Sequence, residues 1–160
     1  MARATHIIGG EIYYDDLGNG QYQVTLTLYR DCGGIAFDGI AAIGVFSGMG
    51  GYLFHQSLPF PGGSFVPIEL DSPCLTLPPD VCVETASYTG VFNLPPRADG
   101  YILAYQRCCR TDEIVNLPNP GDLGLTCTVQ IPGEPNSNNS SPRFNELPPV
   151  ALCQGTPLVF

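Results

Sequence analysis

Seven cysteines offer the most distinctive chemistry in this 160-residue sequence: Cys32, Cys74, Cys82, Cys108, Cys109, Cys127 and Cys153. No two of them have the C-x₂-C spacing of a zinc site, and the sequence contains only two histidines. A framework of disulfide bonds, formed in an oxidising compartment, is therefore the better interpretation. Because the number is odd, at least one thiol is free or bonded to another chain, and we expect this to be Cys127, in the middle of an expected strand.

The spacing of the other cysteines suggests how they pair. A bond between Cys74 and Cys82 would close a short loop and stabilise the fold by roughly 2–3 kcal/mol. Cys108 and Cys109 are neighbours on an expected strand, so we expect one to bridge across a sandwich and the other to bridge outward. The remaining partners, in either order, are Cys32 and Cys153. A redox disulfide between Cys108 and Cys109 themselves is the alternative.

Catalytic machinery is hard to assemble from this sequence. Residues 7–10 (IIGG) resemble the new N-terminus of an activated trypsin-like protease, but neither histidine has a suitable context for a base. Residues 121–124 (GDLG) also lack the serine that such a protease needs. Sequence spacing places no two carboxylates across a cleft as glycosidases require. We therefore expect the chain not to be an enzyme.

A calcium site is the one cofactor that the sequence suggests. Asp15, Asp16 and Asn19 crowd one turn, and calcium prefers flexible oxygen ligands of this kind. The turn matches no EF-hand loop, and Asp and Asn are favoured in tight turns without any metal. We expect no other cofactor.

Charge restricts the partners. The six basic residues are scattered and the fifteen acidic residues give a net charge of −9, which disfavours binding to nucleic acid or to anionic membranes. No apolar run approaches the length of a membrane span, so no membrane insertion is expected.

The elements that must position these residues are strands. Nineteen glycines and sixteen prolines leave little room for long helices. Strand-like runs separated by turn signals cover residues 7–14, 21–30, 41–47, 52–57, 64–70, 82–94, 101–109 and 124–131. Short strands at such intervals predict an all-β fold, an immunoglobulin-like or fibronectin-III-like sandwich with disulfides.

Two local patterns support this fold. Asn19-Gly20 tolerates the positive φ of a tight turn, which predicts a hairpin between the first two strands. In the second strand the apolar residues alternate with polar ones, so one face is core and the other semi-polar. Tyr101 begins a later strand after a Pro-rich turn, where sandwiches carry a corner tyrosine whose hydroxyl bonds back to the backbone.

Composition also suggests the domain boundaries. Residues 133–142 are polar and rich in turn formers, as in a linker. We expect a sandwich over residues 5–132, a linker over 133–142, and an appended strand or the start of a following module over 143–160. Residues 2–4 (ARA) resemble the end of a signal peptide, which favours an extracellular or cell-surface location.

Several segments together resemble one family of proteins. They are residues 5–12 (THIIGGEI), 28–32 (LYRDC), 72–74 (SPC), 81–84 (VCVE), 101–110 (YILAYQRCCR) and 139–144 (NSSPRF), with Pro148, Pro149 and Cys153. This set is similar to the N-terminal region of large surface proteins of gliding Bacteroidota. Those proteins leave the cell by type IX secretion and often end in a gliding-motility-associated sorting domain. The string at residues 105–110 is the most specific part.

The resemblance implies a secreted or cell-surface protein with immunoglobulin-like or cadherin-like modules, and it implies no catalytic residues. Members of the family tend to carry an aromatic residue at the position of Cys127, which favours a free or intermolecular thiol there. The leading hypothesis is thus a non-enzymatic structural or adhesive module.

Two alternatives remain for the function. The chain could be the subunit of an extracellular filament, in which residues 143–160 add a strand to a neighbour's sheet. It could also be a carbohydrate-binding module, with sugars stacked on Tyr13, Tyr14, Tyr52 and Phe54. The expected partners are therefore another copy, neighbouring modules of the same protein, or surface glycans.

Overall fold

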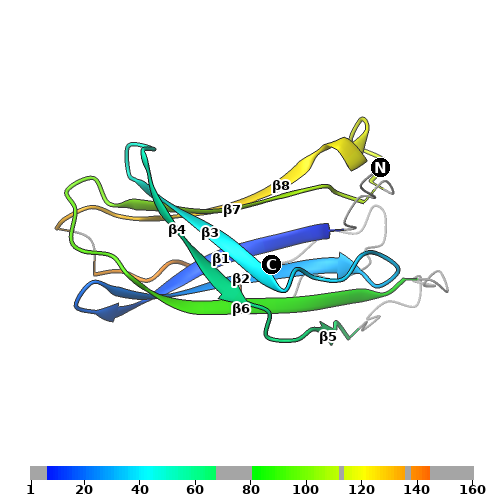
Figure 1. Ribbon diagram of the computed structural model, residues 1–160, viewed down its shortest axis with the longest axis horizontal. Helices are drawn as coiled ribbons and strands as arrows, with labels where there is room; N and C mark the ends of the chain where they lie inside the picture. Colours follow the sequence, from blue (N-terminus) through cyan, green and yellow to red (C-terminus); the bar gives the residue numbers. More distant parts are fainter. Residues whose placement is uncertain (1–6, 68–80, 112–113, 136–137, 145–160) are drawn as a thin grey trace, which may run out of the picture.

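A computed structural model of the chain describes residues 7–67, 81–111, 114–135 and 138–144, which form two antiparallel sheets (Figure 1). The eight strands among these residues are β1 (Ile7–Gly18), β2 (Gln21–Asp31), β3 (Ile40–Ser47), β4 (Tyr52–Pro59), β5 (Ser64–Phe65), β6 (Val83–Asn93), β7 (Tyr101–Cys108) and β8 (Gly124–Ile131). A 3₁₀ turn, η1 (Pro120–Asp122), precedes β8. The described chain contains no helix of the length and apolarity needed to cross a membrane.

The strand order is that of an immunoglobulin-like sandwich. One sheet has the order β1-β2-β6-β5 and the other β4-β3-β7-β8, which correspond to strands A-B-E-D and C′-C-F-G. The predicted sandwich fold is confirmed. β1 and β8 lie beside each other at one side of the sandwich and run in the same direction (Figure 1).

The predicted strands are also found. The exception is residues 64–70, where β5 has two residues and residues 68–70 lie outside the described part. The hairpin between β1 and β2 is confirmed, because Gly18 pairs with Gln21 across a two-residue turn. Asn19 (φ 54°) and Gly20 (φ 71°) both have the positive φ that a type I′ turn requires.

β2 has the alternation expected of it, with one addition. Its even-numbered residues Tyr22, Val24, Leu26 and Leu28 face the core and are at most 4% exposed. Thr25 and Thr27, on the opposite face, are also buried because β2 lies between β1 and β6, which cover it on both sides. Their hydroxyls meet hydroxyls of β6, at 3.0 Å for Thr27 and Ser87. The semi-polar face is thus a ladder of hydroxyl groups.

The core is rich in tyrosine. Tyr14 and Tyr88 are almost fully buried, and Tyr14 meets Tyr22 edge to face with ring centroids 5.7 Å apart. At the start of β7, the Tyr101 hydroxyl donates to the carbonyl of Pro95 at 2.6 Å. This bond confirms the predicted tyrosine corner.

After contacts of Glu134 with the β6–β7 connection, residues 140–143 follow the edge of β1. The Ser141 amide donates to the Tyr14 carbonyl at 3.0 Å, and the Tyr14 amide donates to the Ser141 hydroxyl at 2.8 Å. The Asp16 amide donates to the Ser140 hydroxyl, and Arg143 pairs with Asp15. The segment predicted to end a signal peptide, residues 2–4, and the expected strand after residue 144 lie outside the described residues.

Candidate functional site

Both disulfides among the described residues lie at the same end of the sandwich, opposite the β1–β2 turn (Figure 1). Cys32 follows β2, Cys82 precedes β6, and the two are bonded with Cα atoms 5.5 Å apart. The β2–β6 ladder runs without a shift to Asp31 and Val83, so Cys32 and Cys82 are the next rung. The predicted bond between Cys74 and Cys82 is therefore wrong, since the strand register brings Cys32 to Cys82 within bonding distance. Cys74 lies outside the described residues.

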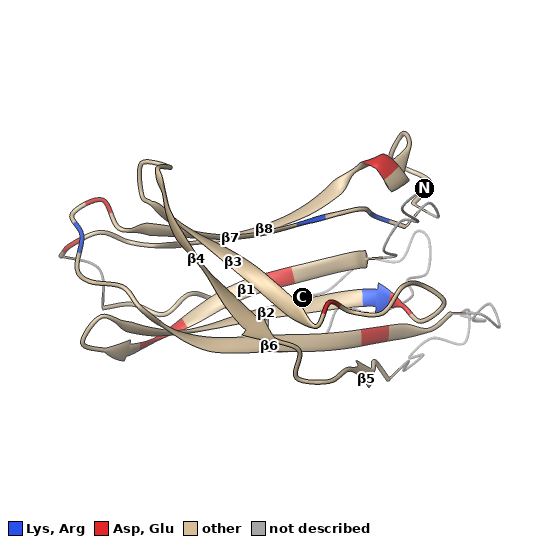
Figure 2. Cartoon of the chain, viewed as in Figure 1, with Lys and Arg blue, Asp and Glu red and all other residues tan. Residues whose placement is uncertain are grey.

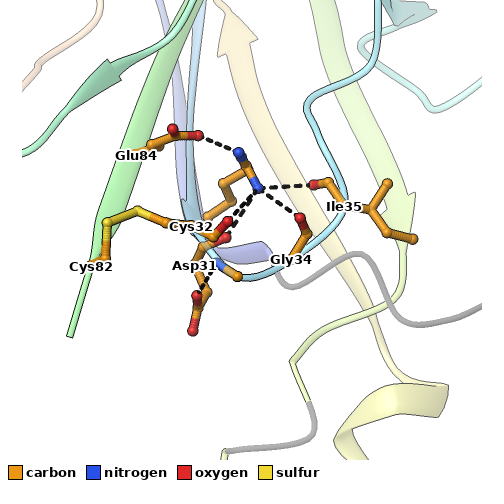
Figure 3. The surroundings of a disulfide bond; sticks show 8 residues. Asp31, Cys32, Gly34, Ile35, Cys82 and Glu84 are labelled. Atoms are coloured by element: carbon orange, nitrogen blue, oxygen red, sulfur yellow. Dashed lines mark hydrogen bonds and ion pairs between the residues drawn. A yellow bond between two sulfur atoms is a disulfide. The ribbon is translucent and has the colours of Figure 1, made fainter. Parts of the chain in front are cut away.

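Beside this disulfide, Arg30 of β2 points inward and closes the end of the core. It is 9% exposed, pairs with Glu84 on the neighbouring strand, and lies 5.3 Å from the centre of the Phe37 ring. Its Nη1 donates to carbonyl oxygens of the loop that follows β2, those of Asp31 (3.1 Å), Cys32 (3.5 Å), Gly34 (3.0 Å) and Ile35 (3.3 Å) (Figure 3). The guanidinium thus holds the loop in place.

The contacts around Arg30 give a structural role to three residues of the LYRDC segment (residues 28–32), namely Arg30, Asp31 and Cys32. The Asp31 carboxylate accepts a bond from the Gly33 amide at 2.7 Å and fixes the first turn of the loop, while Cys32 ties that turn to β6. A buried charge is tolerated only with partners of this kind. Sequence reasoning missed Arg30, although it continues the inward-facing alternation of β2 and so marks a charge on the core side.

A second link at this end joins the two sheets. The Tyr88 hydroxyl of β6 donates to the Asp38 carbonyl at 2.7 Å, and the Asp38 carboxylate pairs with Arg107 of β7. Burial raises the pKa of Tyr88 to about 12, with Tyr105 and Asp38 acting in the same direction and Arg107 opposing them. The phenol is therefore a neutral donor at physiological pH.

Cys108 and Cys109 are bonded to each other at the end of β7. The expectation that they bridge to opposite faces is wrong, and the vicinal alternative is what forms. β7 ends at Cys108, so the alternation of a strand no longer directs Cys109. The chain turns there, and the Arg110 amide donates to the Leu123 carbonyl at 2.9 Å. The redox role of this pair stays a prediction, and Cys153 lies outside the described residues.

Cys127 is a free thiol on β8. Its side chain is 6% exposed and faces β1 at Gly10, where a Cβ would lie 3.3 Å from the sulfur. Burial raises the pKa of the Cys127 thiol. The charge of Arg110 acts to lower this pKa, and the charge of Glu11 acts to raise it. A sulfur packed in this way reaches no second chain while the sandwich stays closed.

The three residues proposed to bind calcium each have a different structural role. The Asp16 carboxylate accepts a bond from the Gly18 amide at 2.8 Å, Asp15 pairs with Arg143, and Asn19 adopts the left-handed turn conformation. Within the described residues, no three His, Cys, Asp or Glu side chains form a group that could hold a metal ion.

The aromatic residues considered for sugar binding do not share one surface. Tyr14 is in the core, and Tyr13 lies under Arg143, 4.9 Å from its guanidinium carbon to the ring centre. Tyr52 (59% exposed) and Phe54 (40% exposed) are together on β4. The Tyr52 hydroxyl bonds to Nδ1 of His55 at 3.0 Å.

β4 belongs to a part of the chain without charge. Residues 39–67, which include β3, β4 and β5, contain no Asp, Glu, Lys or Arg. Figure 2 shows charged residues on β1, β2, β6 and β7 and in the loops, and none on these three strands or on β8. Comparison with known proteins finds no matching family model, no matching curated protein and no matching solved structure.

Proposed function

We propose that the chain is a non-enzymatic structural module of a secreted or cell-surface protein, which bears load along its strands. The observation that carries this proposal is the relation of the first and last strands. β1 and β8 lie side by side and run in the same direction, so β1 begins at the disulfide end and β8 ends at the turn end (Figure 1). A pull between the start of β1 and the end of β8 therefore acts along the strands and loads many ladder hydrogen bonds at once.

The covalent structure supports the same function. The Cys32–Cys82 bond spans 50 residues, and a pulling force cannot extend the chain between them. It joins β2 to β6, the two long neighbouring strands of one sheet. Disulfides persist in oxidising compartments, which supports an extracellular place. The resemblance to surface proteins of gliding Bacteroidota agrees with this.

Single-molecule pulling of the full chain tests the proposal. With handles at Ile7 and Gly133, which lie at the start of β1 and just after β8, we expect a high unfolding force, because the strands are sheared. A matched control with handles at Asn19 and Gly133, which are both at the turn end, should unzip β1 at a clearly lower force. The proposal is falsified if the two directions give the same force.

The same experiment reports on the disulfide. A Cys32→Ala/Cys82→Ala variant should extend further on unfolding by about 180 Å, which is the 50-residue separation at about 3.6 Å per residue. Equal extension of the two proteins would mean that this bond does not form in the loaded module.

The two other functions stay predictions. Strand exchange in a filament would depend on residues 143–160, most of which lie outside the described part. Carbohydrate binding keeps the exposed rings of Tyr52 and Phe54 as its candidates. A glycan array tests this function directly, with Tyr52→Ala as the variant that should lose any signal.

A further inference from the structure

The four edges of the two sheets differ in how they are covered. Residues 140–143 bind the edge of β1, and β8 lies against β1 of the other sheet. β5 offers only two residues. β4, with eight residues, has no strand on its far side among the described residues. An uncovered edge of this length is a template for a further strand.

The backbone of β4 shows which groups are available. The Phe60 amide donates to the Gly39 carbonyl at 3.0 Å, so the backbone N–H and C=O groups of the even-numbered residues in this part of β4 point toward β3. Because backbone groups alternate along a strand, those of His55 and Ser57 point away from β3. The backbone nitrogen of Pro59 also points away from β3, so the sheet loses no hydrogen bond through the missing N–H.

Of the features that usually protect an edge, β4 has a proline at its end and one irregularity, but it has no charged side chain. Tyr52, Leu53 and Phe54 are 59%, 41% and 40% exposed. No charge occurs between Gly39 and Pro67, whereas natural edge strands commonly carry lysine or another charge. One irregularity is present, a shift of register between Tyr52 and Phe54, which leaves Phe54–Pro59 as the regular part of the edge. Apolar exposure on an open edge is typical of an interaction surface.

The charge distribution indicates a second copy of the same chain as the partner. Each copy has a net charge of −9, so two copies repel each other over most of their surface. Two edge strands of this sheet are uncharged, β4 and β8, and β8 lies against β1, so the open edge of β4 is where two copies can approach. A two-fold axis brings the same patch of both copies together, and an apolar patch complements itself where a charged one does not. Two identical edges related in this way are antiparallel, so the donors of one meet the acceptors of the other.

We infer that two copies of the chain associate through β4, with antiparallel pairing around His55 and Ser57 that joins two four-stranded sheets into one. Tyr52 and Phe54 of both copies flank the shared edge. This inference goes beyond the proposed function as a module that resists pulling. The mass of the protein in solution tests the dimer, and single-molecule pulling tests the resistance to force, so one hypothesis can fail while the other is confirmed.

Sedimentation of the full chain over a range of concentrations tests the inference. The wild type should move from 17.1 kDa toward twice that mass as its concentration rises. Ser57→Pro removes one outward N–H and leaves the β3–β4 bonds intact, and Leu53→Lys places a charge on the edge. Each change occurs twice in a symmetric dimer, so each should raise the dissociation constant by at least about tenfold.

Thr128→Lys is the matched control, because it adds the same charge at an exposed position of β8 and should leave the dimer unchanged. Circular dichroism and thermal unfolding of each variant confirm that the sandwich is still folded. As a second measurement, His55→Cys should form a disulfide-linked dimer under mild oxidation, and Thr128→Cys should not.

Three outcomes would overturn the inference. In the first, the wild type stays at monomer mass at the highest soluble concentration. In the second, a dimer forms that Ser57→Pro and Leu53→Lys do not weaken. In the third, the dimer is lost on deletion of residues 145–160 but kept in both β4 variants, which would identify the terminal segment as the occupant.

Discussion

The two ends of the sandwich are closed in different ways. At the disulfide end, the core between the two sheets is closed by the Cys32–Cys82 bond, the buried Arg30 and the hydrogen bond from Tyr88 to Asp38. At the turn end, backbone packs directly on backbone. There the Gly48 amide donates to the Gly100 carbonyl at 3.0 Å, and no disulfide is found in the described part of that end.

The length of the connections explains the difference. The turn end has a two-residue hairpin between β1 and β2 and a short turn between β3 and β4. The disulfide end has the longer segments, such as the one from Cys109 to Leu123. Closing a longer loop loses more chain entropy. The longer loops of the disulfide end are thus held by a covalent bond and a buried ion pair, while the short turns rely on close backbone contacts at glycines and on the Tyr101 hydroxyl.

Loss of the Cys32–Cys82 bond should have the largest effect. For a closed loop of 50 residues, the chain-entropy model gives a loss of about 4 kcal/mol in the free energy of unfolding for Cys32→Ala/Cys82→Ala. Urea unfolding measures it. Cys127→Ala is the control, because it removes a buried cysteine and no covalent bond, and its loss should be clearly smaller. Equal losses would mean that the cross-link is not what holds this end.

Replacing Arg30 should be the next largest change. Arg30→Met leaves Glu84 without its partner and the loop carbonyls without a donor, which should lower the free energy of unfolding by about 3 kcal/mol. The double variant Arg30→Met/Glu84→Leu restores an apolar core end and should regain part of that loss. If the double variant is as unstable as the single one, the loop contacts rather than the ion pair carry the stabilisation.

The turn end should be sensitive to a single methyl group instead. A Cβ at Gly48 would overlap the backbone carbonyl of Asp99, which cannot move aside as a side chain could. We expect Gly48→Ala to lower the free energy of unfolding by about 2 kcal/mol. Gly39→Ala, where a Cβ meets nothing within 4 Å, should change it little. Similar values for both glycines would remove the contrast between the two ends.

The sequence predicts those features that depend on neighbouring residues. The strands, the Asn19-Gly20 turn and the Tyr101 corner are all local patterns, and each is found. The fold class follows from the number and spacing of such strands. The turn end, whose connections are short, is for the same reason the better predicted of the two.

The disulfide end could not be predicted as well, because its contacts depend on long-range register. Cys32 meets Cys82 only because β2 and β6 pair without a shift, and spacing favoured the nearer Cys74 instead. That β4 is an edge strand follows from the order of strands in the sheet, which no local pattern gives. Arg30 is the exception, since the alternation of β2 already placed its charge on the core side.

The smallest effect should come from the hydroxyl of Tyr101. Tyr101→Phe keeps the ring, which lies 5.7 Å from the Arg97 guanidinium carbon, and removes only the bond to the Pro95 carbonyl. We expect a loss of about 1 kcal/mol in the free energy of unfolding at neutral pH, measured in urea. Tyr52→Phe, on the exposed edge of β4, should show almost no change.

The pH dependence of the same variant sharpens the comparison. Burial raises the pKa of Tyr101 above its ordinary value of 10.0, and the hydroxyl can donate only while it is protonated. As the pH rises through that ordinary value, the unfolded chain loses this proton before the folded chain does, so the stability of the wild type falls. Below it both states keep the proton, and no dependence arises from this group. Tyr101→Phe should therefore lose less stability than the wild type between neutral and alkaline pH. If the two proteins fall in parallel, the Tyr101 proton makes no contribution to stability in this pH range. If Tyr101→Phe is as damaging as Arg30→Met, a side-chain contact closes the turn end as firmly as Arg30 closes the disulfide end.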